Sequence, residues 1–110
     1  MNLSNSLKEK LFELVSALSL GDFYKISANK WLGRTTAPDL KRVILEYGKT
    51  LTLPPENFLE VADIFELDDE CAILIDIPLW TQEEGRSDLV ISVQVALPKE
   101  DVSINDLRVP

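Results

Sequence analysis

The 110-residue sequence contains no histidine, and this absence removes much of the usual chemistry of enzymes. Histidine is the commonest general base, the usual partner of a nucleophilic serine or cysteine, and a frequent transition-metal ligand. An enzyme with this sequence would depend on carboxylates, lysines or tyrosines alone. We therefore expect a non-catalytic protein that uses no metal ion and no cofactor.

Cysteine and long apolar runs are also scarce. The single cysteine, Cys71, excludes an internal disulfide and a cysteine-rich zinc cluster. No apolar run approaches the roughly 18 residues that a bilayer-spanning helix needs. The N-terminal residues MNLSNSLKEKLFELV carry charges among their apolar positions, so we expect no signal peptide and a cytoplasmic location.

Basic residues are scarce in one half of the chain only. Residues 1–50 contain eight Lys/Arg and five Asp/Glu, a net charge of +3, whereas residues 51–110 contain three Lys/Arg and fourteen Asp/Glu, a net charge of −11. An acidic half repels nucleic acid and membrane phosphates and attracts basic proteins. The division predicts a basic protein partner, and the simpler alternative is that the acidity only keeps a small protein soluble.

The first half of the chain has the apolar spacing of helices. A capping box begins at Ser6, and apolar side chains then follow one helical face to a stop at Gly21. A second capping box begins at Thr36, with a proline in the first turn, and that helix ends at Gly48. Residues 22–34 between them fit a short helix or a loop.

After the double proline Pro54-Pro55 the apolar period changes to two. Turn signals at Asp68-Asp69, Trp80–Asp88 and Pro98–Asp101 separate four segments of strand length: EVADIFEL, CAILIDIPLW, LVISVQVAL and VSINDLRV. The last segment changes phase, which predicts a bulge near Asn105-Asp106. Four consecutive antiparallel strands form a meander.

The pattern therefore predicts one α+β domain over residues 1–110. Its helical half, residues 1–50, contributes two helices and a short one, which pack on one face of the four-stranded sheet formed by residues 56–110.

The pairing of the strands can be predicted, because a slip of one residue would exchange the two faces of a strand. Pairing Leu79 with Leu89 aligns aliphatic side chains along both central strands. Cys71 then lies on the same aliphatic face, where we expect it to be a small core residue. A two-residue turn then places Ile64 opposite Ile73. This aliphatic face is where we expect the helices to pack.

The opposite face of the predicted sheet brings Asp63 and Asp76 close together. Two neighbouring carboxylates are compatible with acid–base chemistry or with a divalent cation. Aspartates on the solvated face of an antiparallel sheet are ordinary, however, and contact with a partner is a further alternative.

The segment PLWTQEEGRSDL joins the two central strands. Thr81 and Glu84 predict a capped single turn that Gly85 ends, and Arg86 can pair with Glu84 or Asp88. The segment is either a partner-binding loop, since Trp and Arg are frequent at interfaces, or a self-contained hairpin whose tryptophan covers the end of the core. The candidate partner-binding residues on this loop and on the sheet face are Asp63, Asp76, Trp80, Glu83, Glu84, Arg86 and Asp88.

The segments IDIPLWTQEEGRSDLVISV and INDLRV resemble a family of small bacterial domains of unknown function, and the resemblance extends back to ILEYG and the double proline. It implies no established activity. The order of helices before a meander is similar to cystatin-like and NTF2-like folds. The size, acidity and fold style resemble immunity proteins of bacterial toxin systems, which implies that a basic nuclease toxin is the partner.

We therefore expect a non-catalytic, acidic protein-binding domain, most concretely an immunity protein that neutralises a nuclease-type toxin. The alternatives are an NTF2-like module with a small-ligand pocket between helices and sheet, and a domain that forms a homodimer through the sheet face. Neither nucleic acid nor a membrane is an expected partner.

Overall fold

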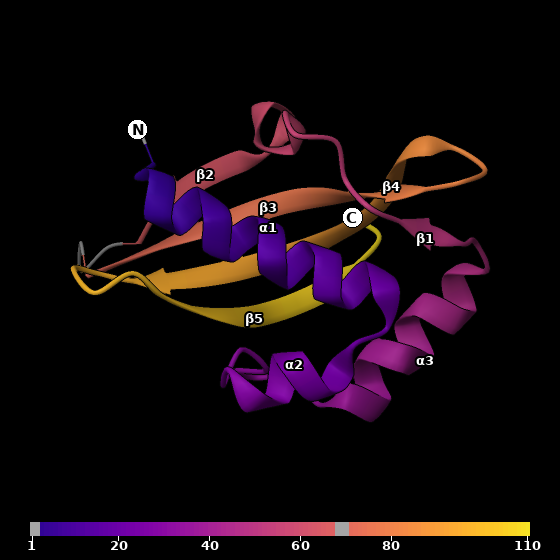
Figure 1. The fold of residues 1–110 in the computed structure, drawn as a ribbon, viewed down its shortest axis with the longest axis horizontal. Coiled ribbons are helices and arrows are strands. Elements are labelled where there is room, and N and C mark those ends of the chain that lie inside the picture. The colour runs from indigo at the N-terminus through magenta and orange to yellow at the C-terminus, as the bar shows by residue number, and fades with distance from the viewer. Residues whose placement is uncertain (1–2, 68–70) are drawn as a thin grey trace.

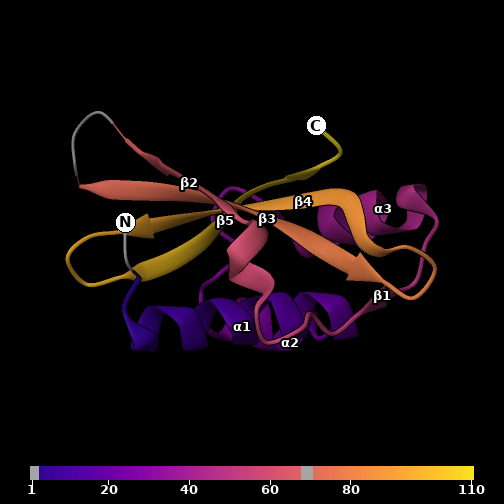
Figure 2. The same ribbon diagram turned by 90° about the horizontal axis from the view of Figure 1, so that it is seen from above.

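The computed structural model describes residues 3–67 and 71–110 as two layers. Figures 1 and 2 show α1 and α2 on one face of an antiparallel sheet, with α3 toward the end of the sheet that carries β1. The helices are α1 (Asn5–Leu20), α2 (Phe23–Ala28), α3 (Ala37–Tyr47) and the 3-10 helix η1 (Phe58–Val61). The strands are β1 (Leu51–Thr52), β2 (Asp63–Glu66), β3 (Ala72–Thr81), β4 (Gly85–Ala96) and β5 (Asp101–Arg108).

This arrangement confirms the α+β class with helices on one face of the sheet. The meander β2-β3-β4-β5 is confirmed, and the short β1 adds a strand beside β3, on the edge that β2 also occupies. The closer likeness to cystatin-like or NTF2-like folds stays a prediction. None of the described helices combines the length and apolarity that crossing a membrane requires.

The starts of α1 and α3 are each capped by a single hydroxyl group. Thr36 accepts a hydrogen bond from the Asp39 N–H, as predicted for α3. In α1 the predicted cap at Ser6 is wrong, because Ser4 accepts the hydrogen bond from the Leu7 N–H. The Ser4 hydroxyl also donates to the Glu100 carboxylate, 96 residues away, and this tertiary contact is invisible in the local sequence.

The segment after α2 is hydrogen-bonded to β5, at the edge of the sheet. The Ile104 N–H donates to the Trp31 carbonyl at 2.7 Å, and the Arg34 N–H donates to the Ile104 carbonyl at 3.2 Å. Gly33 lies between them with a φ of 57°, and a Cβ at this position would lie 2.6 Å from the Ile104 oxygen. Only glycine fits this close crossing, which ties the helical half to the sheet.

The β3–β4 pairing agrees with the prediction from Ala72 to Pro78, including Ile75 opposite Val93, but the predicted Leu79–Leu89 pair is not in the register. The pairing of β2 with β3 differs from the prediction by two residues, since Ile64 lies opposite Ile75 rather than Ile73. A shift of two preserves the faces, because side chains alternate with a period of two. The predicted turn at Asp68-Asp69 lies outside the described residues.

The two predicted irregularities have different outcomes. The bulge in the last strand is confirmed, because the β4–β5 register shifts and leaves Asn105 as an extra residue. The prediction of a long loop over Trp80–Asp88 is wrong. The β3–β4 ladder extends to a Thr81–Gly85 pair, which leaves only three residues in the turn. An unpredicted register shift lies between Pro78 and Trp80, where the Ser87 hydroxyl donates to the Leu79 carbonyl at 2.8 Å.

The aliphatic face of the central strands is the inner face, as predicted. Side chains of β3, β4 and α1 fill the space between the layers with at most 2% exposure: Ile73, Ile75, Ile77, Leu79, Leu89, Ile91, Val93, Val95, Leu7, Leu11, Leu14 and Leu18. Each such side chain contributes roughly 1.5–3 kcal/mol of transfer free energy. The core position predicted for Cys71 is wrong, because this residue precedes β3 and is exposed there.

Candidate functional site

The outer face of the sheet carries a row of polar side chains across four strands. Asp63 on β2 lies directly opposite Asp76 on β3, and the row continues through Ser92 to Asp106 on β5. The sequence predicts the Asp63–Asp76 neighbourhood correctly. It does not predict the extension of the row to β5, because that depends on the β4–β5 register, which places Asp106 opposite Ser92.

Arg108 compensates the charge of Asp76. Its guanidinium donates to Asp76 Oδ2 at 3.3 Å and to Ser92 Oγ at 2.6 Å, while the Ser92 hydroxyl donates to Asp76 Oδ1. A weaker ion pair joins Arg108 to Asp106 at 3.7 Å. The Asp76 side chain is only 18% exposed and Ser92 only 1%. Asp76 is therefore part of a closed hydrogen-bonded network, whereas Asp63 beside it is exposed.

Among its described residues, the outer face offers no set of metal ligands. Within residues 3–67 and 71–110, no three side chains of His, Cys, Asp or Glu gather closely enough to hold a metal ion.

Glu83 at the hairpin turn is bound to the segment before β1. The Thr50 N–H donates to Glu83 Oε1 at 2.8 Å, and the Thr50 hydroxyl donates to Oε2 at 3.0 Å. The adjacent Gln82 N–H donates to the Thr50 carbonyl at 2.8 Å. The hydrogen bond from the Thr50 N–H holds the pKa of the Glu83 carboxyl below its ordinary value. Glu83 therefore fastens the hairpin to the chain leaving α3.

Glu84 makes a second connection, to α3 itself. The Tyr47 hydroxyl donates to Glu84 Oε1 at 2.9 Å and accepts a hydrogen bond from the Asp88 N–H at 3.1 Å. Thr81 caps the turn by accepting from the Glu84 N–H, as predicted, and Gly85 adopts the left-handed φ of 74°. Partial burial raises the pKa of the Tyr47 phenol, and the hydrogen bond to Glu84 raises it further.

Among the described residues, the side chains of Trp80, Arg86 and Asp88 form no hydrogen bond, although Trp80 packs partly against the core. Trp80 alternates with the buried Leu79 and Thr81, so it lies on the outer face, half-buried, opposite Arg86. In the described part of the chain Arg86 forms no ion pair with Glu84 or Asp88, and the Asp88 carboxylate has no hydrogen-bond donor. The predicted pairing of Arg86 is therefore not formed.

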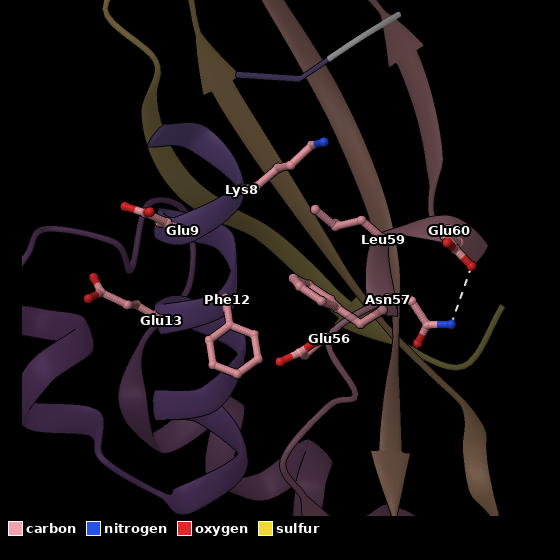
Figure 3. A pocket seen from close by; sticks show the side chains of 9 residues that line it. Lys8, Glu9, Phe12, Glu13, Glu56, Asn57, Leu59 and Glu60 are labelled. Atoms are coloured by element: carbon pink, nitrogen blue, oxygen red, sulfur yellow. Dashed lines mark hydrogen bonds between the residues drawn. The ribbon is translucent and has the colours of Figure 1, made fainter. Parts of the chain in front are cut away.

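A groove that sequence analysis misses lies between α1 and the segment around η1 (Figure 3). We call it the Phe12 groove, and it has a volume of about 590 Å³. Its lining residues are Lys8, Glu9, Phe12 and Glu13 of α1 and Glu56, Asn57, Phe58, Leu59 and Glu60. One signal was present in the sequence, since Phe12 is an aromatic residue on the polar side of α1, off the apolar stripe that forms the core.

The fold and the outer surfaces define a small α+β domain with an acidic, partly apolar exterior. The chain belongs to the family described as Domain of unknown function (DUF7668), whose match spans residues 15–110. The resemblance to a domain family of unknown function is thereby confirmed. The N-terminal part of α1, including Phe12, precedes the matched residues. No curated protein and no solved structure matches the chain.

Proposed function

We propose that this protein is a non-catalytic binding domain that holds a basic protein partner against its acidic sheet half. The observation that carries the proposal is the uncompensated charge of this half, which has fourteen Asp/Glu against three Lys/Arg. Of those three cations, only Arg108 forms ion pairs with the described residues, and it is engaged by Asp76 and Asp106. The charge is therefore left to act on a partner at a distance.

The candidate residues divide into two roles under this proposal. Asp63 and Asp88 are exposed carboxylates without internal donors among the described residues, so they are the groups that would pair with lysine or arginine of the partner. Trp80 lies half-buried on the same outer face as Asp63 and supplies contact area there, beside Arg86. Asp76, Glu83 and Glu84 already accept hydrogen bonds within the fold, so they are not the groups that pair directly with the partner. Glu83 and Glu84 contribute long-range attraction, whereas Arg108 neutralises Asp76.

The most concrete form of the proposal is an immunity protein that covers and neutralises a basic, nuclease-type toxin in the cytoplasm. The acidic composition and the small single-domain fold support it. Such pairs associate rapidly because complementary charge steers the encounter, and the association rate falls as salt screens the charges over a Debye length of about 10 Å at 0.1 M and about 3 Å at 1 M.

The test is to express the chain with the protein encoded by the adjacent gene and to measure binding by surface plasmon resonance at increasing NaCl. The expected result is a basic partner whose association rate falls about tenfold or more between low and high salt. Reversing the charge of Asp63 and Asp88 to lysine should lower the association rate, whereas the same reversal at Glu46 in the helical half serves as the control. An association rate that changes neither with the salt concentration nor with the charge reversal at Asp63 and Asp88 would overturn the proposal.

Of the two alternatives, a specific observation favours only dimerisation. Phe65 is 49% exposed and pairs with Leu74 on the outer face, which leaves apolar surface next to Asp63. Sedimentation equilibrium over a range of concentrations tests this, and a strict monomer would dispose of it. The ligand-binding alternative needs an apolar pocket between the layers, where the side chains of α1, β3 and β4 are fully buried against each other.

A further inference from the structure

The Phe12 groove combines an aromatic surface with uncompensated negative charge. Phe58 is 3% exposed and forms the floor, and Phe12 packs edge-on against it with ring centroids 5.8 Å apart. Phe12 as a residue remains 37% exposed. Leu59 continues the apolar surface along the wall opposite α1 (Figure 3). A side chain entering the groove therefore meets an exposed ring face and an adjoining aliphatic surface.

Four carboxylates surround this apolar floor, against one cation, Lys8. Only Glu60 has a donor within the described chain, the Asn57 amide at 3.3 Å. The other three carboxylates, Glu9, Glu13 and Glu56, accept no hydrogen bond and form no ion pair with any described residue.

The charged side chains of the groove lie on different sides of the Phe12 ring. Figure 3 shows Glu56 on one side of the Phe12 ring and Glu13 on the other, while Lys8 points away from the ring. In this view the Phe12 ring lies between these two glutamates, and Lys8, the one cation among the described lining residues, does not point toward it.

An exposed aromatic ring flanked by carboxylates favours a cationic side chain. A guanidinium stacks on the negative ring face and at the same time donates hydrogen bonds to carboxylate oxygens, which an apolar or an acidic side chain cannot do. The protein contains a cation–π contact elsewhere, between the Lys41 ammonium and the Phe23 ring, with Nζ 5.1 Å from the ring centroid. The apolar wall beside the ring suits an aliphatic neighbour of the cation.

We propose that the Phe12 groove is the docking site for an arginine-bearing segment of the basic partner. This inference rests on the proposed function and specifies where and by which chemistry the partner is held. An arginine of the partner stacks on Phe12 between Glu13 and Glu56, and an adjacent aliphatic side chain of the partner packs on Leu59. The acidic outer face then attracts the partner, and the groove selects the arginine.

The probe is a blocked tetrapeptide of alternating leucine and arginine, titrated into the ¹⁵N-labelled full chain and followed by NMR. We expect chemical-shift changes confined to residues 8–13 and 56–60. A matched peptide with citrulline in place of arginine has the same shape without the charge, and it should not bind. Replacing Lys8 with glutamine should strengthen binding, because it removes the one cation of the groove.

Variants of the groove test the assignment of the ring and the acids. Phe12→Leu keeps the apolar volume against Phe58 but removes the ring face, and we expect peptide affinity to fall about fivefold. The double variant Glu13→Gln/Glu56→Gln should lower it at least as much. Glu46→Gln, an exposed carboxylate of the helical half, is the control that should leave affinity unchanged. A heteronuclear spectrum of each variant verifies the fold.

The outcomes separate this inference from the proposed function. Shift changes at other surfaces, or equal binding of the citrulline peptide, would overturn the groove as an arginine site. If the partner protein binds normally to the Phe12→Leu variant, the groove assignment fails while the proposed function stands. If the arginine peptide binds in the groove but no basic protein partner binds the chain, the proposed function fails and the chemistry of the groove stands.

Discussion

Two groups of carboxylates in this protein look alike in the sequence and differ in the structure. Glu83 and Glu84 at the hairpin turn accept hydrogen bonds from Thr50, Tyr47 and Thr81, and they join the sheet to the helical half. Glu13 and Glu56 in the Phe12 groove accept none from any described residue. The distribution of internal donors therefore distinguishes acids that hold the fold together from acids that do not, which acidic composition by itself cannot do.

The difference has an energetic meaning. A carboxylate that accepts hydrogen bonds from the folded chain favours the folded state, and its removal leaves donors without their acceptor. A carboxylate without donors, next to others of the same charge, favours the unfolded chain slightly. The hairpin acids are thus accounted for by stability. The groove acids are not, which is why we assign them to a partner.

The largest loss of stability should come from disrupting the hydrogen-bonded network of Asp76, Ser92 and Arg108 on the outer face. Arg108→Leu removes both donors that the guanidinium supplies to Ser92 and Asp76 and leaves a mostly buried carboxylate with one hydroxyl donor. We expect a loss of about 1–2 kcal/mol in the free energy of unfolding. Urea denaturation measures it. Arg86→Leu, at an arginine that forms no ion pair in the described chain, is the control and should change stability by less than about 0.5 kcal/mol.

The next effect concerns the link between α3 and the hairpin. Tyr47→Phe removes the hydroxyl that donates to Glu84 and accepts from the Asp88 N–H, and we expect a loss of about 1 kcal/mol in urea denaturation. Tyr24→Phe is the matched control, since Tyr24 is 84% exposed. Equal stability of the two variants would mean that the hairpin acids do not hold the fold, and the contrast with the groove would disappear.

A smaller effect depends on pH through Glu83. The pKa of this carboxyl is lowered in the folded state by the Thr50 hydrogen bond, so its stabilising contribution is fully present above the unfolded value of 4.5 and is lost as the pH falls through the folded value. The Glu83→Gln variant lacks this titration. The difference in urea midpoint between wild type and variant should therefore be present at neutral pH and shrink as the pH falls below 4.5. A difference that is constant with pH would contradict the role assigned to Glu83.

Several structural features follow from local sequence patterns because their causes are local. The helix end at Gly48, the cap at Thr36 and the buried face of β3 and β4 depend on nearby residues or on side-chain alternation. The sequence predicts which face of β2 is buried but misplaces its pairing with β3 by two residues. Side-chain alternation fixes the face, and a shift by an even number of residues does not change it.

The features that escaped prediction depend on contacts distant in sequence. Ser4 rather than Ser6 caps α1, and the Ser4 hydroxyl also donates to Glu100, far along the chain. The part of β4 from Gly85 to Asp88 is polar, so no apolar period marks it as a strand. The Phe12 groove needs α1 to lie beside η1, more than 40 residues further along the chain. The roles of Glu83 and Glu84 were open for the same reason, because their donors lie in another element.

The smallest expected change in stability is the one that distinguishes the groove carboxylates from the hairpin carboxylates most sharply. Glu9 and Glu13 lie one helical turn apart on α1, and like charges at this spacing destabilise a helix by about 0.2–0.5 kcal/mol. Glu13→Gln should therefore raise the free energy of unfolding by about that amount, while it weakens binding of the arginine peptide.

Gain of stability with loss of binding is the behaviour expected of a residue kept for an interaction rather than for the fold. Urea denaturation and the NMR titration of the same sample measure the two quantities together. A loss of stability above about 0.5 kcal/mol would show that Glu13 has an internal role like that of Glu84, and the distinction between hairpin and groove would then no longer hold.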